Sequence, residues 1–124
     1  MSERYELELA LLPPNPNQVR GEHWTRTHAR RREVGFAVLA GWAAAGRPRA
    51  RGRRAFVHVH FRAPGRPDDL DNRLARCKQL LDQLVSCGAL VDDSPRYLEI
   101  DVPSRETGRP TLTTVSISYG DEAA

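Results

Sequence analysis

Long apolar runs, cysteine and lysine are all scarce in this chain of 124 residues. No apolar run is long enough to span a bilayer, and the first ten residues are charged where a signal peptide is hydrophobic, so we expect a cytoplasmic protein without a membrane segment. Its two cysteines, Cys77 and Cys87, are ten residues apart on one expected helix, about 15 Å along the axis, which is too far for a disulfide. They match no metal-ligand or redox motif, and we interpret them as reduced packing residues.

Charge is unevenly distributed over a chain that is long enough for one domain, residues 1–124, and too short for two. Residues 20–66 hold twelve arginines against two glutamates, whereas residues 67–124 have a net charge of −5. A basic segment next to a cluster of acidic residues suggests a polyanionic partner that binds beside a cation site. A GC-rich genome explains much of the arginine count without any function, but it does not explain why the only lysine, Lys78, lies among the aspartates.

Hydrophobic periodicity predicts four strands and two helices. Alternating apolar and polar residues predict strands at 5–9, 56–61, 98–102 and 113–119, with a hairpin loop at 106–110 between the last two. Val34, Val38 and Trp42 recur at a spacing of four and predict a first helix. Leu39 joins its apolar side, and Gly46 ends it. The order β-α-β-α-β-β predicts a single α+β domain, in which two helices cover one face of a small mixed sheet.

A second helix is predicted between residues 69 and 88. Its apolar stripe, with steps of four and three residues, consists of Leu70, Leu74, Cys77, Leu81 and Leu84. Asp71 and Lys78 share the flank about 100° round from this stripe. Asp69 or Asp71 is placed to cap the helix, and Gly88 is placed to end it.

Six of the eight aspartates lie between residues 67 and 93, around this helix. Asp69, Asp71 and Asp93 offer hard anionic oxygen ligands without histidine or thiolate, which suits Mg²⁺, with Mn²⁺ as the alternative ion, and argues against zinc. We expect the chain after the helix to return and bring Asp93 towards the first pair. Together with the Lys78 ammonium and a basic surface, such a site is equipped to hydrolyse a phosphodiester.

Simpler interpretations of these residues stay open. An Asp-x-Asp at a helix start is commonly a cap, and Asp-Asp-Ser-Pro is commonly a turn, so each motif alone is weak evidence for a site. His58 and His60 could ligate a metal from one face of a strand, but we favour a partly buried histidine pair because no acidic partner lies within that strand.

Four motifs together resemble the RusA family of Holliday junction resolvases. They are His-Trp-x-x-Arg at His23, Trp24 and Arg26, Asp-Leu-Asp-Asn at Asp69–Asn72, Lys-x-x-x-Asp at Lys78 and Asp82, and Gly-Ala-Leu-Val-Asp-Asp at Gly88–Asp93. The resemblance covers nearly the whole chain. It implies a homodimeric, Mg²⁺-dependent endonuclease that binds four-way DNA junctions and nicks two opposing strands. By motif, Asp69, Asp71 and Asp93 match the metal-binding aspartates, and Lys78 matches the catalytic lysine.

Two positions depart from the family pattern. In its best-known form the lysine follows the second Asp of the Asp-Leu-Asp-Asn motif by four residues, where this chain has Ala75. Lys78 follows by seven residues, and Arg76 is an alternative for the same task. The residue before the motif is often basic in the family but is Asp68 here, which would pass the local phosphate contact to Arg66.

Contacts to DNA are expected from the basic part of the chain. We expect His23, Arg26, Arg30, Arg66 and the loop 47–54 to hold the DNA backbone, with Trp24 either stacking on an exposed base or bracing its loop. A symmetric dimer would match the approximate two-fold symmetry of a four-way junction.

The sequence leaves two alternative functions open. The first is a non-catalytic binder of branched DNA, in which the aspartates are only caps and turns. The second is a prophage nuclease of the same fold that acts on other branched or flap DNA.

Overall fold

The computed structural model describes residues 3–15 and 24–122 of the chain. Within them, the elements follow in the order β1 (Glu3–Leu9), α1 (Trp24–Ala44), β2 (Arg53–Ala63), α2 (Leu70–Ser86), β3 (Leu98–Ile100), β4 (Ser104–Thr107) and β5 (Leu112–Glu122). The prediction of an α+β fold with two helices and a small mixed sheet is confirmed.

The sheet is built around β2 and β5. Strand β5 runs antiparallel to both β1 and β2, so it lies between them. Strands β3 and β4 both pair in parallel with the remaining edge of β2, one after the other. The strand order is therefore β1-β5-β2, with β3 and β4 sharing the last edge.

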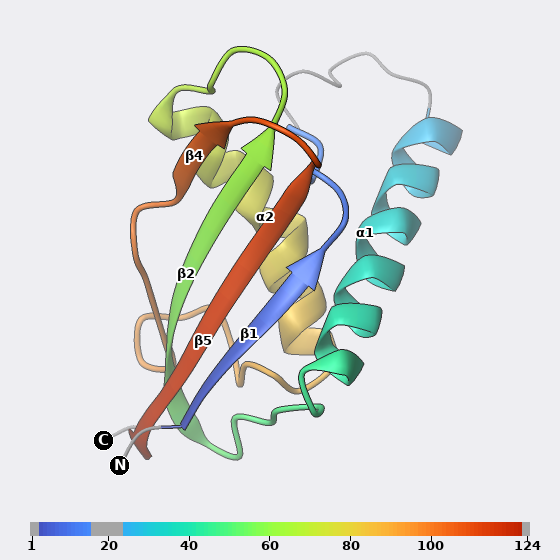
Figure 1. Ribbon diagram of the computed structural model, residues 1–124. Helices are drawn as coiled ribbons and strands as arrows, with labels where there is room; N and C mark the ends of the chain where they lie inside the picture. The colour runs from blue at the N-terminus through green and yellow to red at the C-terminus, as the bar shows by residue number, and fades with distance from the viewer. Residues whose placement is uncertain (1–2, 16–23, 123–124) are drawn as a thin grey trace.

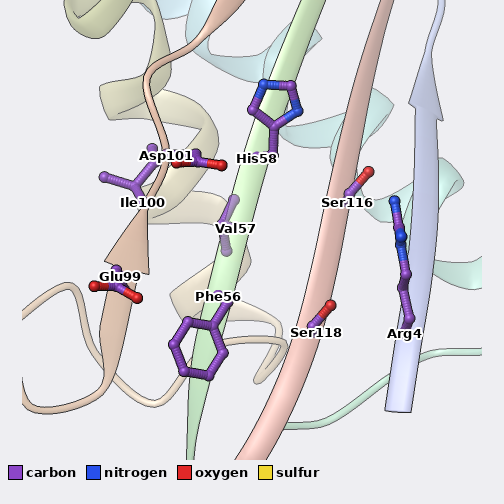
Figure 2. A pocket seen from close by; sticks show the side chains of 9 residues that line it. All are labelled: Arg4, Phe56, Val57, His58, Glu99, Ile100, Asp101, Ser116 and Ser118. Carbon is purple, nitrogen blue, oxygen red and sulfur yellow. The ribbon is translucent and has the colours of Figure 1, made fainter. Parts of the chain in front are cut away.

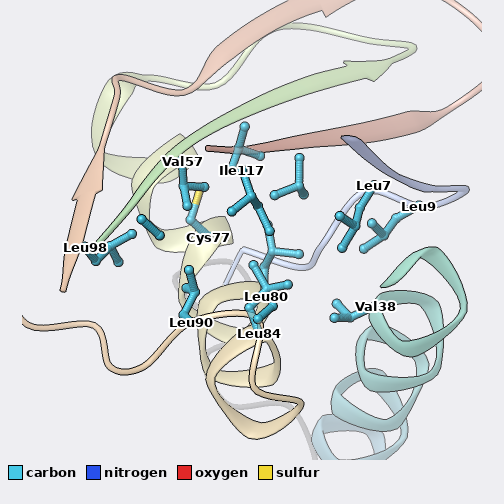
Figure 3. Close-up of a cluster of buried hydrophobic side chains, with 14 of the residues drawn as sticks. Leu7, Leu9, Val38, Val57, Cys77, Leu80, Leu84, Leu90, Leu98 and Ile117 are labelled. Atoms are coloured by element: carbon cyan, nitrogen blue, oxygen red, sulfur yellow. The ribbon is translucent and has the colours of Figure 1, made fainter. Parts of the chain in front are cut away.

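Both helices pack against one face of this sheet, and the apolar core lies between the two layers (Figure 1; Figure 3). The predicted alternation along the strands places their apolar side chains in this core. Among the largest fully buried residues are Leu7, Leu9, Val34, Val38, Val59, Phe61, Leu80, Leu84, Val115 and Ile117. Both helices begin at the end of the molecule where β2 finishes, and β1 begins and β5 finishes at the opposite end (Figure 1).

The predicted hairpin at 106–110 is wrong. Residues Ser104–Thr107 form β4, which pairs with β2, and the chain then crosses to the other side of β2 to enter β5. The predicted strand over 98–102 also ends early, at Ile100, and Val102 is 63% exposed. Pro103 follows and has no N–H to donate to the ladder, which explains why the edge strand is split into two short pieces.

The predicted apolar stripe of α2 is only partly right. Cys77 and Leu84 are buried as expected, but Leu70 and Leu74 are 44% and 43% exposed. The buried side of the helix is instead rotated towards Arg76, because that side chain is paired inside the protein. In α1, Leu39 is likewise 44% exposed, on a face that it shares with Phe36.

The sheet face opposite the helices carries no covering element in the described part of the chain (Figure 1). Its side chains are mostly polar, but Phe56 is 39% exposed there. Within the same described residues, no helix combines the length and the apolarity that crossing a bilayer requires.

Candidate active site

Helix α2 starts with two exposed carboxylates, Asp69 and Asp71. Asp69 is the N-cap residue, with extended backbone angles of −64° and 163°, yet its side chain makes no capping hydrogen bond. An aspartate that serves only as a cap accepts a hydrogen bond from a backbone N–H two or three residues later. Capping therefore does not account for the Asp69 side chain. Neither carboxylate pairs with another side chain in the described residues, so both can accept a ligand from solvent.

The preceding residue, Asp68, is turned into the protein. It accepts two hydrogen bonds from Arg76, at 2.6 Å from Nε and 3.2 Å from Nη2, and one of 3.1 Å from Nη1 of Arg105. The three side chains are only 8%, 8% and 3% exposed. The hydrogen bonds from Arg76 lower the pKa of Asp68 below its ordinary value of 3.8, and the nearby positive charges act in the same direction.

This ion pair involves Arg76, one of the two cations that the sequence left open. Arg76 also donates from Nη1 to the carbonyl oxygen of Pro13, at 2.6 Å, so its guanidinium is held inside the protein. Lys78 is exposed on the same side of α2 as Asp71, two turns further along, or about 10 Å. The structure therefore favours Lys78 as the cation that can reach a bound phosphate. Asp82 lies one turn beyond Lys78, but the described residues show no ion pair between them.

The third predicted ligand, Asp93, lies elsewhere. It belongs to the loop after α2, where its backbone N–H donates to Asp92 at 2.8 Å and forms the turn that the sequence allowed. This loop leads to Tyr97, whose carbonyl accepts from Ala55 near the start of β2. Asp69 lies near the far end of β2, since Asp68 contacts Arg105 of β4. One chain thus does not bring Asp93 to the first pair.

The fit to a divalent cation is consequently partial. Two exposed carboxylates at one point are the hard oxygen ligands that Mg²⁺ and Mn²⁺ prefer. In the described residues of a single chain, however, no three histidine, cysteine, aspartate or glutamate side chains are placed to hold a metal together. The start of α2 offers two exposed carboxylates, Asp69 and Asp71, which in the described residues do not form a metal site by themselves.

Three of the predicted DNA-binding arginines lie at one end of the molecule (Figure 1). His23 and the side chain of Trp24 lie outside the described residues. Arg26 and Arg30 are exposed on the first two turns of α1, and Arg66 is exposed in the turn before α2. Because the two helices begin at the same end, these arginines lie at the end that carries Asp69 (Figure 1).

The loop 47–54 is in part the exposed basic loop that was expected, because Arg47, Arg49 and Arg51 are exposed. Pro48 and Ala50 are buried, and Arg53 belongs to β2. The Arg53 guanidinium stacks on Tyr119 at 4.4 Å and pairs with Glu3 at 3.3 Å. The loop follows the end of α1, so it lies at the opposite end of the molecule from the arginines above (Figure 1).

His58 and His60 form a partly buried pair, as favoured from the sequence. Nδ1 of His60 lies 2.7 Å from the Ser104 hydroxyl, which is also 3.3 Å from Nε2 of His58. Nε2 of His60 lies 3.0 Å from Glu106. These contacts join β2 to the split edge strand, which is a structural role.

The uncovered sheet face carries a hollow of about 320 Å³ (Figure 2). Phe56 lies in it, with Arg4 on one side and Glu99 and Asp101 on the other. Its mixed charges differ from the arginine-rich surroundings of the α2 start, and it lies on the other face of the sheet.

Sequence reasoning missed the pairing of Asp68. Arg76 lies eight residues later and Arg105 belongs to a different strand, so no helix or strand spacing links them. The available signal was the acidic residue at a position where the resembled family often has a basic one.

No protein-family model matches this chain, and no curated protein matches it either. The resemblance to the RusA family therefore rests on the four sequence motifs alone.

Proposed function

We propose that this protein is a cytoplasmic, metal-dependent endonuclease that resolves four-way DNA junctions by paired symmetrical nicks, in DNA recombination and repair. The observation that carries the proposal is the start of α2. Asp69 and Asp71 are exposed there and pair with no side chain among the described residues, at the same end as the arginine-rich start of α1. The motifs that resemble the RusA family support the same activity.

Each of these residues has a separate task in the proposal. Asp69 and Asp71 would hold Mg²⁺ or Mn²⁺, and the bound ion would supply an activated water and neutralise charge on the scissile phosphate. Lys78 stabilises the negative charge that builds on the phosphate, because its compact ammonium can approach a single oxygen. Arg26 and Arg30 hold the DNA backbone. Hydrolysis leaves a 5′-phosphate and a 3′-hydroxyl.

A homodimer is part of this proposal. Resolution needs two matched cuts, which two copies related by a two-fold axis would supply. Because Asp93 lies far from Asp69 along the sheet of its own chain, it can complete a ligand set only if another copy brings it there. The partial ligand set of one chain is thus consistent with a site that forms on assembly.

The same partial ligand set favours one rival, a non-catalytic binder of branched DNA. In that case binding is indifferent to Mg²⁺ and the substitution Asp71→Asn has no effect. A nuclease that acts on flap or three-way DNA is separated from a resolvase by comparing those substrates with a four-way junction.

The test compares cleavage and binding of a labelled four-way junction by the wild type, Asp71→Asn, Lys78→Ala and a control, Asp101→Asn. Asp101 is an exposed carboxylate on the uncovered sheet face, so its substitution changes the same charge at a different place. We expect the first two variants to bind but to cut at least about 100-fold more slowly. The control should cut like the wild type. If the wild type binds but never cuts with Mg²⁺ or Mn²⁺, the catalytic proposal fails.

A further inference from the structure

Helices α1 and α2 line an open hollow of about 260 Å³ on the surface of the helix layer. Phe36 lies in it and is 66% exposed, the largest exposed fraction among the large apolar side chains of the described residues. Leu39, almost one turn further along α1, is 44% exposed in the same place. The lining includes His28, Arg31, Arg32, Phe36, Leu39 and Gln83, and we call it the Phe36 hollow.

The polar part of the Phe36 hollow is basic. His28, Arg31 and Arg32 are exposed on the turns of α1 that precede Phe36, and Gln83 faces them from α2. Among the described residues, no aspartate or glutamate belongs to the lining. The charges around the Phe36 ring are therefore complementary to an anion, and the ring itself offers that anion an apolar surface.

Helical spacing places these groups in one row. His28, Arg32, Phe36 and Leu39 follow one another at steps of four, four and three residues, so they share one face of α1. Neighbours at this spacing are about 5–6 Å apart at their Cβ atoms. A ligand that carries a phosphate next to a flat ring can thus contact a guanidinium and the Phe36 ring together.

The hollow on the uncovered sheet face is the natural comparison. It also exposes a phenylalanine, Phe56, at 39%, but Glu99 and Asp101 lie on one side of it (Figure 2). Carboxylates in that position repel a phosphate. Of these two hollows, the one that suits an aromatic anion is therefore the Phe36 hollow.

We propose that the Phe36 hollow binds an unpaired DNA strand, with a base stacked on the Phe36 ring and phosphates held by Arg31 and Arg32. Aromatic side chains in a positively charged groove bind single-stranded nucleic acid in this way. Within a duplex the base faces are stacked on one another, whereas a single strand or a branch point exposes them. The inference rests on the proposed function for its DNA partner, and it names the part of branched DNA that this face contacts.

The test measures binding of a labelled oligothymidylate of about ten nucleotides by fluorescence anisotropy, in EDTA and at several salt concentrations. The variants are Phe36→Leu, Phe36→Tyr and a double variant, Arg31→Gln with Arg32→Gln. Phe56→Leu is the matched control, because it makes the same change in the hollow of the sheet face. Since Phe36 is mostly exposed, its replacement should leave the fold intact, which circular dichroism checks.

The variants should change different features of binding. Phe36→Leu should weaken binding at least about fivefold at every salt concentration, because leucine keeps an apolar surface but has no ring for stacking. Phe36→Tyr and Phe56→Leu should bind like the wild type. The arginine double variant should reduce the slope of log affinity against log salt by about 1.4, since each phosphate contact on a single strand contributes about 0.7.

Three results would overturn the inference. The first is a Phe36→Leu variant that binds like the wild type, and the second is an equal loss of binding in Phe56→Leu. The third is a wild type that does not bind the oligonucleotide. In that case, loss of self-association in Phe36→Glu would identify the hollow as an interface between two copies of the chain.

Junction cleavage keeps this inference separate from the proposed function, because oligonucleotide binding in EDTA requires no metal. If the wild type binds the oligonucleotide through Phe36 but never cuts a four-way junction, the proposed function fails and the inference stands. If the wild type cuts the junction and Phe36→Leu leaves oligonucleotide binding unchanged, the inference fails and the proposed function stands.

Discussion

Asp68 and Asp69 are adjacent, carry the same side chain and have opposite surroundings. Asp68 is enclosed by two arginines, whereas Asp69 faces solvent and makes no capping bond. Burying a carboxylate is costly unless it is paired and hydrogen-bonded. The bidentate bond from Arg76 and the third bond from Arg105 meet that requirement, so only the first aspartate can be buried.

Replacement of Asp68 should reduce stability in a pH-dependent way. Asp68→Asn leaves two buried guanidinium groups without their anion, and we expect a loss of about 3 kcal/mol near pH 7. The folded-state pKa of Asp68 is lowered, so its contribution is present above the ordinary value of 3.8 and disappears as the pH falls below it. Urea unfolding at pH 7 and pH 3 measures this. An equal difference between wild type and variant at both pH values would show that the carboxylate charge is not responsible.

The two cysteine thiols should differ in reactivity. Burial raises the pKa of Cys77 to about 12, and its side chain lies in the core, so it should resist a thiol reagent at pH 8. Cys87 is half-buried, with a raised pKa, and should react slowly. A count of reactive thiols before and after denaturation in urea tests this, with two expected after unfolding. Rapid modification of both thiols in the native protein would show that Cys77 does not lie in the buried core.

At the level of elements, α2 carries the site because its two sides have different tasks. The inner side packs Cys77, Leu80 and Leu84 against the sheet. The outer side holds Asp71 and Lys78 in solvent, seven residues and about 10 Å apart. The helix thus sets the spacing between the proposed metal pair and the proposed catalytic cation.

Truncation of the leucines of α2 should distinguish its inner side from its outer side. Leu80 is fully buried, so Leu80→Ala should lower the free energy of unfolding by about 2–5 kcal/mol. Leu74 is 43% exposed, and Leu74→Ala should cost less than about 1 kcal/mol. Chemical denaturation of the two variants compares them directly. Equal losses would mean that the helix faces the core with the stripe expected from the sequence.

Local patterns predicted these elements better than their pairing. The alternation of apolar and polar residues located β1, β2 and β5, because one face of each strand is buried. This pattern depends only on the sequence of the strand itself. The buried side of α2 also includes Arg76, whose partners come from outside the helix. Periodicity alone therefore predicted the burial of Cys77 and Leu84 correctly but that of Leu70 and Leu74 wrongly. Strand β4 has four residues and follows Pro103, too short a segment for an alternation to be recognised.

The sequence likewise predicted only part of the arrangement of the candidate site. The motif chemistry indicated Asp69, Asp71 and Lys78, and all three are exposed along one helix. The position of Asp93 depends on where the loop after α2 runs, which is fixed by long-range contacts with the start of β2. A residue-by-residue pattern contains no information on such contacts.

At the level of the whole molecule, exposed arginines lie at both ends. The exposed arginines at the start of α1 and the carboxylates at the start of α2 lie at the same end (Figure 1), whereas several arginines of loop 47–54 contact aromatic rings or carbonyls. A DNA backbone is therefore expected to bind across the end where both helices begin.

Binding of a four-way junction should weaken steeply with salt, because phosphate contacts release counterions. Replacing Arg26 and Arg30 together with alanine should reduce the slope of log affinity against log salt by about 2. Arg4→Ala, on the uncovered sheet face, is the matched control and should leave the slope unchanged. Fluorescence anisotropy at several salt concentrations gives these slopes. A larger change in this slope for Arg4→Ala than for the double variant of α1 would indicate that DNA binds the open sheet face.

The most direct measurement is to label each strand of a four-way junction in turn and map the nicks made by the wild type with Mg²⁺, with a linear duplex of the same sequence alongside. We predict nicks in two opposing strands at equal distances from the crossover, none in the duplex and none without a divalent cation. Binding without any nick in Mg²⁺ or Mn²⁺, or equal cutting of the linear duplex, would contradict a junction-resolving endonuclease.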